Sequence, residues 1–197
     1  MTRTLSLALV VCMVGVTGCF RSPSPHFYSL VSQERIPSAD QLAQNGVSVE
    51  VVPLIFPQYL NDPRLVVRSG DHEVLKEEYD RWAEDLDVNF RRVLLSDLSR
   101  NLKSGNVFSS DVYSQRRGAH VVQVEVLQFD VSEQGRAVLK SRWATAPNRE
   151  ALASAPLMIS EFEGQAANSS SEARVSALSN LIDTLSKVVA QGIQSRG

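Results

Sequence analysis

The sequence has few of the residues on which common protein chemistry depends. Its 197 residues include two Cys and three His, which is too few for a typical structural zinc site. The formal net charge of −2 leaves no basic excess to neutralise phosphates, and this argues against a nucleic-acid binder. With 43% hydrophobic and 21% charged residues, the composition matches neither a disordered chain nor a disulfide scaffold.

Motifs of catalysis and nucleotide binding are missing as well. The sequence contains no G-x-S-x-G nucleophile turn, no glycine-rich phosphate loop and no H-E-x-x-H zinc motif. An acidic cluster between residues 77 and 87 lacks the ligand spacing of a calcium loop. Carboxylates in the first turn of a helix offset the helix dipole, which is the simpler explanation. We therefore expect no catalytic residue, no metal and no cofactor.

An apolar stretch from Leu5 to Val16 follows a short basic start. It is too short to cross a bilayer, which takes about 20 residues, and it predicts a secretory signal. Its end, Val16-Thr17-Gly18-Cys19, resembles a bacterial lipobox, in which the Cys is lipidated and becomes the first mature residue. We predict a signal peptide over residues 1–18 and lipid attachment at Cys19. The alternative is an ordinary exported protein that is cleaved nearby.

Processing at this site would determine how the protein is held in the cell envelope. Cys12 would leave with the signal, so no intrachain disulfide could form. Residues 19–26 would be the lipidated Cys and a tether, and residues 27–197 the folded domain. Stable attachment takes more than one acyl chain, and bacterial lipoproteins that resemble this one carry several. Phe20, rather than Asp, follows Cys19; by resemblance to proteobacterial sorting, this favours the periplasmic face of the outer membrane.

The hydrophobic pattern of the remaining chain predicts a single α/β domain. Two long helices should cover a mixed, mostly antiparallel sheet of five or six strands. Strand-like patterns, including a hairpin around Ser69-Gly70-Asp71, occur at residues 27–31, 47–52, 65–68, 73–76, 107–113, 120–131, 137–145 and 157–164. The strict alternation of residues 120–131 is interrupted, which indicates a bulge.

Two segments have the apolar spacing of long helices. The first is predicted from Asp80 to Ser104, with Asp80 as its cap and Gly105 at its end. The second helix is predicted to begin after a capping box at Ser169 and to end at about Gln194. Its apolar stripe covers fewer than three heptads, so we expect it to pack on the sheet rather than in a coiled coil between subunits.

Residues 56–68 are apolar and aromatic but interrupted by Pro57 and Pro63. Proline cannot donate a ladder hydrogen bond, so this segment cannot be a regular central strand. Two interpretations stay open. The segment either closes the edge of the sheet, or it presents Phe56, Tyr59 and Leu60 to a partner, since tyrosine is favoured at interfaces.

The segment FPQYLNDPRLVVR and the later RWAEDL resemble the paired motif of the ABC-type transport auxiliary lipoproteins, the family that includes the PqiC-like proteins. The family pattern is roughly P-x-Y-L-D-R-P-x-[IVL]-V-x-R and then R-W-A-E-P-L. Asp62 stands where the family usually has Arg, and Asp85 where it usually has Pro. The matching residues are Pro57, Tyr59, Leu60, Pro63, Val66, Arg68, Arg81, Trp82, Ala83, Glu84 and Leu86.

The resemblance implies a non-enzymatic outer-membrane lipoprotein of an MCE-type, ABC-linked system that moves lipid between the two membranes. It would dock the periplasmic MCE-domain protein, as a ring of several copies, and touch the membrane through acylated Cys19. Trp82, Glu84 and Leu86 would be structural, and we expect Trp82 in the core because it falls on the apolar stripe of the predicted helix. The residues expected at the partner surface are Phe56, Pro57, Tyr59, Leu60, Pro63, Arg64, Arg68 and Arg81.

Two other kinds of function stay open. The first is an anchored periplasmic hydrolase, which would need a convergent catalytic set that the sequence does not reveal. The second is a structural cell-envelope lipoprotein that binds peptidoglycan.

Overall fold

A computed structural model of the chain describes residues 23–32, 46–113, 117 and 120–195. The predicted signal peptide and Cys19 lie outside these residues. The two long helices are α2 (Leu86–Leu102) and α4 (Ser171–Gln194), and the short ones are η2 (Gln58–Leu60) and α3 (Arg149–Leu152). The strands are β1 (His26–Tyr28), β2 (Val49–Val51), β3 (Arg64–Ser69), β4 (Glu73–Trp82), β5 (Val107–Ser109), β6 (His120–Ser132), β7 (Arg136–Ala146) and β8 (Met158–Gln165).

All eight strands belong to one sheet, and β6 is its central strand. One edge of β6 pairs antiparallel with β7, which pairs antiparallel with β8. The other edge has two parallel partners in succession, β2 near its start and β3 near its end. The β3–β4 hairpin adds β1, and β2 adds β5. The predicted fold class is confirmed, since the three longest pairings are antiparallel. The sheet has eight strands rather than five or six, because each of the eight strand-like patterns forms a strand of it.

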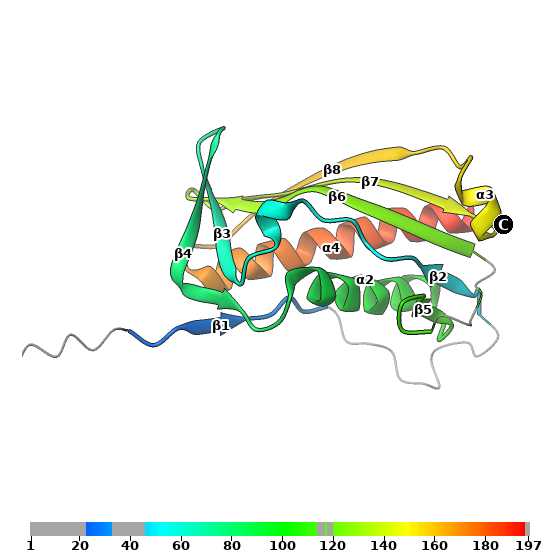
Figure 1. The fold of residues 1–197 in the computed structure, drawn as a ribbon, viewed down its shortest axis with the longest axis horizontal. Coiled ribbons are helices and arrows are strands. Elements are labelled where there is room, and N and C mark those ends of the chain that lie inside the picture. The colour runs from blue at the N-terminus through cyan, green and yellow to red at the C-terminus, as the bar shows by residue number, and fades with distance from the viewer. Residues whose placement is uncertain (1–22, 33–45, 114–116, 118–119, 196–197) are drawn as a thin grey trace, which may run out of the picture.

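Both long helices cover the same face of the sheet (Figure 1). Helix α4 lies against β7 and β8, and α2 packs on α4 and β5. The core between these layers includes a run of aromatic rings from Phe56 to Phe90 to Phe129, with centroids 5.2 and 5.1 Å apart in edge-to-face contacts. The prediction that the last helix packs on the sheet is confirmed. Among the described residues, no helix is long and apolar enough to span a membrane.

The first predicted helix was placed too early. Residues 80–82 belong to β4, where they pair with β1, and α2 begins only at Leu86. The Trp82 amide donates to the Pro63 carbonyl at 2.7 Å and the Ala83 amide to the Tyr28 carbonyl at 2.8 Å. This backbone pairing to neighbours on both sides outweighs the helical spacing of the apolar side chains. Asp80 therefore caps no helix, and α2 ends at Leu102, where the cap is Lys103 in a left-handed conformation rather than Gly105.

Among the other predicted elements, the strand expected at residues 73–76 continues to Trp82 and the one expected at residues 107–113 ends at Ser109, while the remaining ends lie close to those observed. The bulge in β6 falls between Val126 and Gln128, within the interrupted pattern. Helix α4 ends at Gln194 as expected, but its cap is Ser170, whose hydroxyl accepts from the Ala173 amide at 3.2 Å. The predicted cap at Ser169 was therefore wrong by one residue.

Candidate functional site

The proline-interrupted segment runs beside β6, between the strand positions of β2 and β3. Ile55 forms an isolated bridge with Glu125: its amide donates to the Val124 carbonyl at 3.2 Å, and its carbonyl accepts from the Val126 amide at 2.8 Å. Beyond Ile55 the chain leaves the ladder, forms the η2 turn and rejoins the sheet at β3. The chain thus closes this edge of β6, which is one of the two interpretations given above. It leaves the ladder after Ile55 because its prolines cannot donate the ladder hydrogen bonds.

Two motif residues from this region meet at Asp130, a residue that the sequence analysis missed. The Tyr59 hydroxyl donates to Asp130 Oδ2 at 3.0 Å, and Arg68 Nη2 donates to the same oxygen at 2.6 Å. Gln128 Nε2 also donates to Asp130 Oδ1, at 2.8 Å. The Asp130 side chain is only 1% exposed, and a buried carboxylate requires such charge-assisted partners. The only signal in the sequence was an acidic residue next to Phe129 in a Val-rich strand.

The environment of Tyr59 keeps its hydroxyl protonated. Burial, together with the nearby Asp130 carboxylate, raises the pKa of Tyr59 to about 12. The phenol therefore acts as a hydrogen-bond donor at all physiological pH values. Through their hydrogen bonds to Asp130, Tyr59 and Arg68 attach the loop to the sheet.

The other apolar motif residues are mostly turned inward. Leu60 is 3% exposed and Trp82 is 6% exposed, and the half-buried Phe56 ring packs on Phe90. Trp82 and Leu86 lie in the core, as expected of them. Leu60 therefore supports the loop from beneath and leaves the polar residues Gln58 and Asn61 exposed at its surface.

Asp62, which departs from the family pattern, makes ion pairs within its own neighbourhood. Its carboxylate accepts from Arg64 Nε at 2.9 Å and from Lys76 Nζ at 2.6 Å, so it joins the loop to both strands of the β3–β4 hairpin. These contacts hold the pKa of Asp62 well below its ordinary value, Arg64 being the larger cause. Arg64, predicted at the partner surface, is therefore already paired inside the chain.

The second half of the motif lies across from this loop. Glu84 forms an ion pair with Arg92, while the buried Arg81 Nε has no hydrogen-bond partner among the described residues. Between the two motif halves run two adjoining hollows of about 320 and 240 Å³. We call them together the motif groove. Its lining residues are Leu54, Phe56, Gln58, Leu60, Asn61, Asp62, Pro63, Trp82, Ala83, Glu84, Asp85, Leu86 and Asp87.

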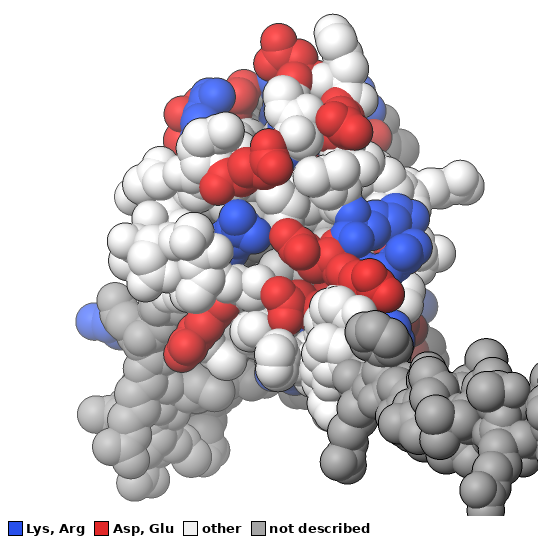
Figure 2. Space-filling model, turned by 90° about the vertical axis from the view of Figure 1, so that its left-hand side faces the viewer, with Lys and Arg blue, Asp and Glu red and all other residues white. Residues whose placement is uncertain are grey.

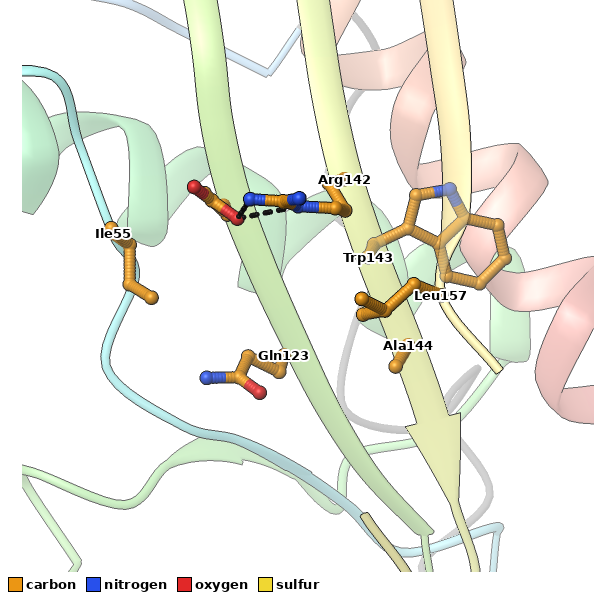
Figure 3. A pocket seen from close by; sticks show the side chains of 7 residues that line it. Ile55, Gln123, Arg142, Trp143, Ala144 and Leu157 are labelled. Carbon is orange, nitrogen blue, oxygen red and sulfur yellow. Dashed lines mark hydrogen bonds and ion pairs between the residues drawn. The ribbon is translucent and has the colours of Figure 1, made fainter. Parts of the chain in front are cut away.

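A separate hollow of about 310 Å³ lies on the face of the sheet that the helices leave open. Figure 3 shows Ile55 on one side of it and Leu157 on the other. Between them Arg142 Nε donates to Glu125 Oε2 at 2.7 Å. The Trp143 indole turns away and donates to the Ser160 hydroxyl at 3.0 Å. The two charges of this hollow thus neutralise one another.

The end of the molecule that carries β1 is strongly polar. Figure 2 shows acidic side chains gathered across the centre of this end, with basic side chains beside them. Asp80 of β4 accepts from the Tyr28 hydroxyl at 3.3 Å, pairs with His26 Nδ1 at 3.2 Å and accepts from the Ser171 hydroxyl at 2.5 Å. The carboxylate thereby joins β1, β4 and the start of α4. Within the described ranges, no group of three or more His, Cys, Asp or Glu residues could hold a metal ion.

The fold has close counterparts among solved structures. An uncharacterized protein aligns with a TM-score of 0.67 and 20% identity, over 87% of this chain and 99% of that chain. A DUF330-family protein, XCC0632 from Xanthomonas campestris, aligns with the same TM-score and coverage at 11% identity. These identities support a shared fold and nothing finer. No protein of curated function matches the sequence.

A match to a family model identifies the family of the chain, whereas the solved structures show its fold alone. The model for the ABC-type transport auxiliary lipoprotein component matches residues 28–190. This range begins in β1 and ends within the last helix, and it contains both motif halves and the groove between them. The chain therefore belongs to the family of ABC-type transport auxiliary lipoprotein components.

Proposed function

We propose that this protein is a non-catalytic outer-membrane lipoprotein that docks the periplasmic MCE assembly of an ABC-linked lipid transport system. Residues 1–18 would be its signal peptide, Cys19 its lipid anchor and residues 19–26 its tether. The partner would be an MCE-domain protein. The membership of the chain in a transport auxiliary lipoprotein family supports the proposal in its coarse form.

The observation that carries the finer proposal is the motif groove. The two motif halves, residues 56–68 and 81–86, are separated in sequence by the hairpin turn and most of β4, yet they line one continuous surface hollow. Its floor includes Leu54, Phe56 and Leu86, but most of its exposed lining is polar, with Gln58 and Asn61 at the rim and the carboxylates of Asp85 and Asp87 beside them. A small apolar centre within a polar rim is compatible with a non-obligate protein–protein interface. We infer that the partner contacts this rim and floor, while Tyr59 and Arg68 hold the loop in place.

The position of the groove suits a membrane-anchored docking protein. Residues 19–25, fully extended, span at most about 25 Å, and β1 begins directly after them, at His26. Ala83, which lines the groove, donates its amide to the carbonyl of Tyr28 in β1. A lipid on Cys19 would therefore hold the groove near the membrane surface.

The test is to fill the groove without disturbing what lies beneath it. Gln58 and Asn61 are exposed, so Gln58→Trp with Asn61→Trp should leave the unfolding midpoint unchanged. Co-purification of the lipidated chain with the MCE-domain protein should fall at least tenfold, since two bulky side chains on the rim would obstruct the groove. His72→Trp, on the exposed hairpin turn, is the matched control and should bind like the wild type. Undiminished co-purification by the double variant would refute the groove as the docking site.

A further inference from the structure

The sheet face opposite the helices is more apolar than a solvent-facing sheet usually is. An antiparallel sheet with one covered face normally presents polar side chains on the other. Here four large aliphatic side chains stay exposed on or beside β6 and β8. They are Ile55 at 48%, Leu127 at 36%, Leu157 at 63% and Ile159 at 69%.

Strand register places two of these side chains at opposite ends of one row. Ile55 pairs with Glu125, Glu125 with Arg142, and Arg142 with Ile159. Because neighbouring strands are about 4.8 Å apart, the backbones of Ile55 and Ile159 are separated by roughly 14 Å. The next row has Gln123 opposite Ala144, close to Leu157.

These rows form a trough along the strand direction. Ile55 makes one wall and Leu157 with Ile159 the other, as Figure 3 shows for Ile55 and Leu157. The floor consists of Gln123, the small Ala144 and the Glu125–Arg142 pair, and the hollow above it measures about 310 Å³. We call this surface the outer trough.

The charges around the outer trough are paired across the strands. Arg142 pairs with Glu125, Lys140 with Glu161, and Arg136 with Glu163. The surface therefore presents no excess charge of either sign, and an occupant with an uncharged apolar face complements it. Attraction would come from burial of the aliphatic walls, at about 25 cal/mol per Å² of apolar area.

We propose that the outer trough binds an amphipathic α-helix of another protein. A helix with its side chains is about 10–12 Å wide, so it fits within the roughly 14 Å that separates the backbones of the two walls. A single extended strand, about 5 Å across, would leave one wall uncovered. If two copies of this chain packed with their outer troughs facing each other, the walls would meet first and the two floors would stay out of contact. The inference is independent of the motif groove and of the proposed transport role.

The test is photocrosslinking from the full-length chain in the membranes of its own host. The photoreactive residue p-benzoylphenylalanine replaces Ile55, Leu157 or Ile159, one at a time, and mass spectrometry maps the crosslinked residues. We expect all three trough positions to crosslink to one polypeptide, at residues spaced three and four apart, as on one helix face. Val112, which is 67% exposed on the chain after β5, is the control position.

Four results would overturn the proposal. They are crosslinking no stronger than at Val112, crosslinks only to other copies of this chain, crosslinks only to lipid, and a spacing of two that indicates an extended strand. A variant adds a second readout. Ile159→Lys should lower crosslinking from position 55 at least tenfold and leave the unfolding midpoint unchanged, whereas Val112→Lys should do neither. Full crosslinking from position 55 in Ile159→Lys would likewise contradict the proposal.

Discussion

Among the individual residues, Asp130 has the contacts on which the attachment of the loop depends. Its side chain is 1% exposed and accepts from Tyr59, Arg68 and Gln128. Two of these donors belong to the family motif, so the motif has a structural task within this chain. Removing one member of such a buried set leaves the others without a partner, which costs more than the loss of a surface ion pair.

Asp130→Ala should lower the free energy of unfolding by about 3 kcal/mol, the size expected when a buried charge pair loses one partner. Urea unfolding followed by tryptophan fluorescence measures this difference. Glu161→Ala removes an exposed pair with Lys140 and should cost no more than about 1 kcal/mol. Equal losses in the two variants would show that the Asp130 network does not stabilise the fold.

Tyr59 predicts how stability depends on alkaline pH. Its pKa is about 12 in the folded protein and about 10 in the unfolded chain. The contribution of the protonated phenol is complete below pH 10 and declines as the pH rises from 10 to 12, because only the unfolded chain releases the proton there. The slope approaches 1.4 kcal/mol per pH unit. The difference in unfolding free energy between wild type and Tyr59→Phe, measured from pH 8 to 12, should shrink above pH 10. A difference in unfolding free energy that stays constant from pH 8 to 12 would contradict the raised pKa of Tyr59 in the folded protein.

At the scale of secondary-structure elements, β1 depends on side chains more than on its ladder. It pairs with β4 over three residues only. Asp80 binds it from β4, and the buried Asn89 of α2 accepts from the Leu30 amide at 2.6 Å and donates to the Leu30 carbonyl at 3.2 Å. These contacts hold in place the element that follows the proposed membrane tether.

Asp80→Ala should therefore loosen β1 selectively. Amide exchange in residues 26–28 should quicken about tenfold, which corresponds to roughly 1.4 kcal/mol of local stability, because the donors of Tyr28 and Ser171 lose their acceptor. Exchange in β6 and β7 should stay as in the wild type. Glu78→Ala, an exposed change on the same strand, is the control. If β1 exchanges equally in both variants, Asp80 does not hold it.

For the whole molecule, the open edge of β8 bears on the predicted ring of copies. Strand β8 pairs with β7 in eight consecutive registers without a bulge, and within the described part of the chain it has no other strand partner. It contains neither Lys nor Pro, two of the residues that commonly protect an edge, and its charged residues are Glu161 and Glu163, both paired with β7. A long, regular edge of this kind favours coverage by another strand.

Native mass spectrometry of a soluble form without Cys19 measures the copy number directly. We expect assemblies of several copies, since β8 pairing would satisfy the backbone groups along its edge. A monomer at all micromolar concentrations would contradict the ring. The same spectra would also show any lipid that the domain retains.

Local patterns were enough to predict much of the fold. Turn residues around Gly70 located the β3–β4 hairpin, the interrupted alternation of residues 120–131 located the β6 bulge, and apolar spacing located α4. Each of these features depends on residues close in sequence. The paired motif likewise pointed to the family that the family model identifies.

Only the tertiary structure decided what lies far apart in sequence. Residues 80–82 became strand rather than helix because Pro63 and Tyr28 offered backbone partners there. Tyr59 and Arg68 attach the loop to the sheet because the parallel pairing of β3 with β6 places Asp130 within reach of both side chains. The sequence by itself thus determined most of the elements and the family, since side-chain periodicity and turn chemistry are local. Which surfaces remain open for partners depends on contacts between distant segments, which only the folded chain establishes.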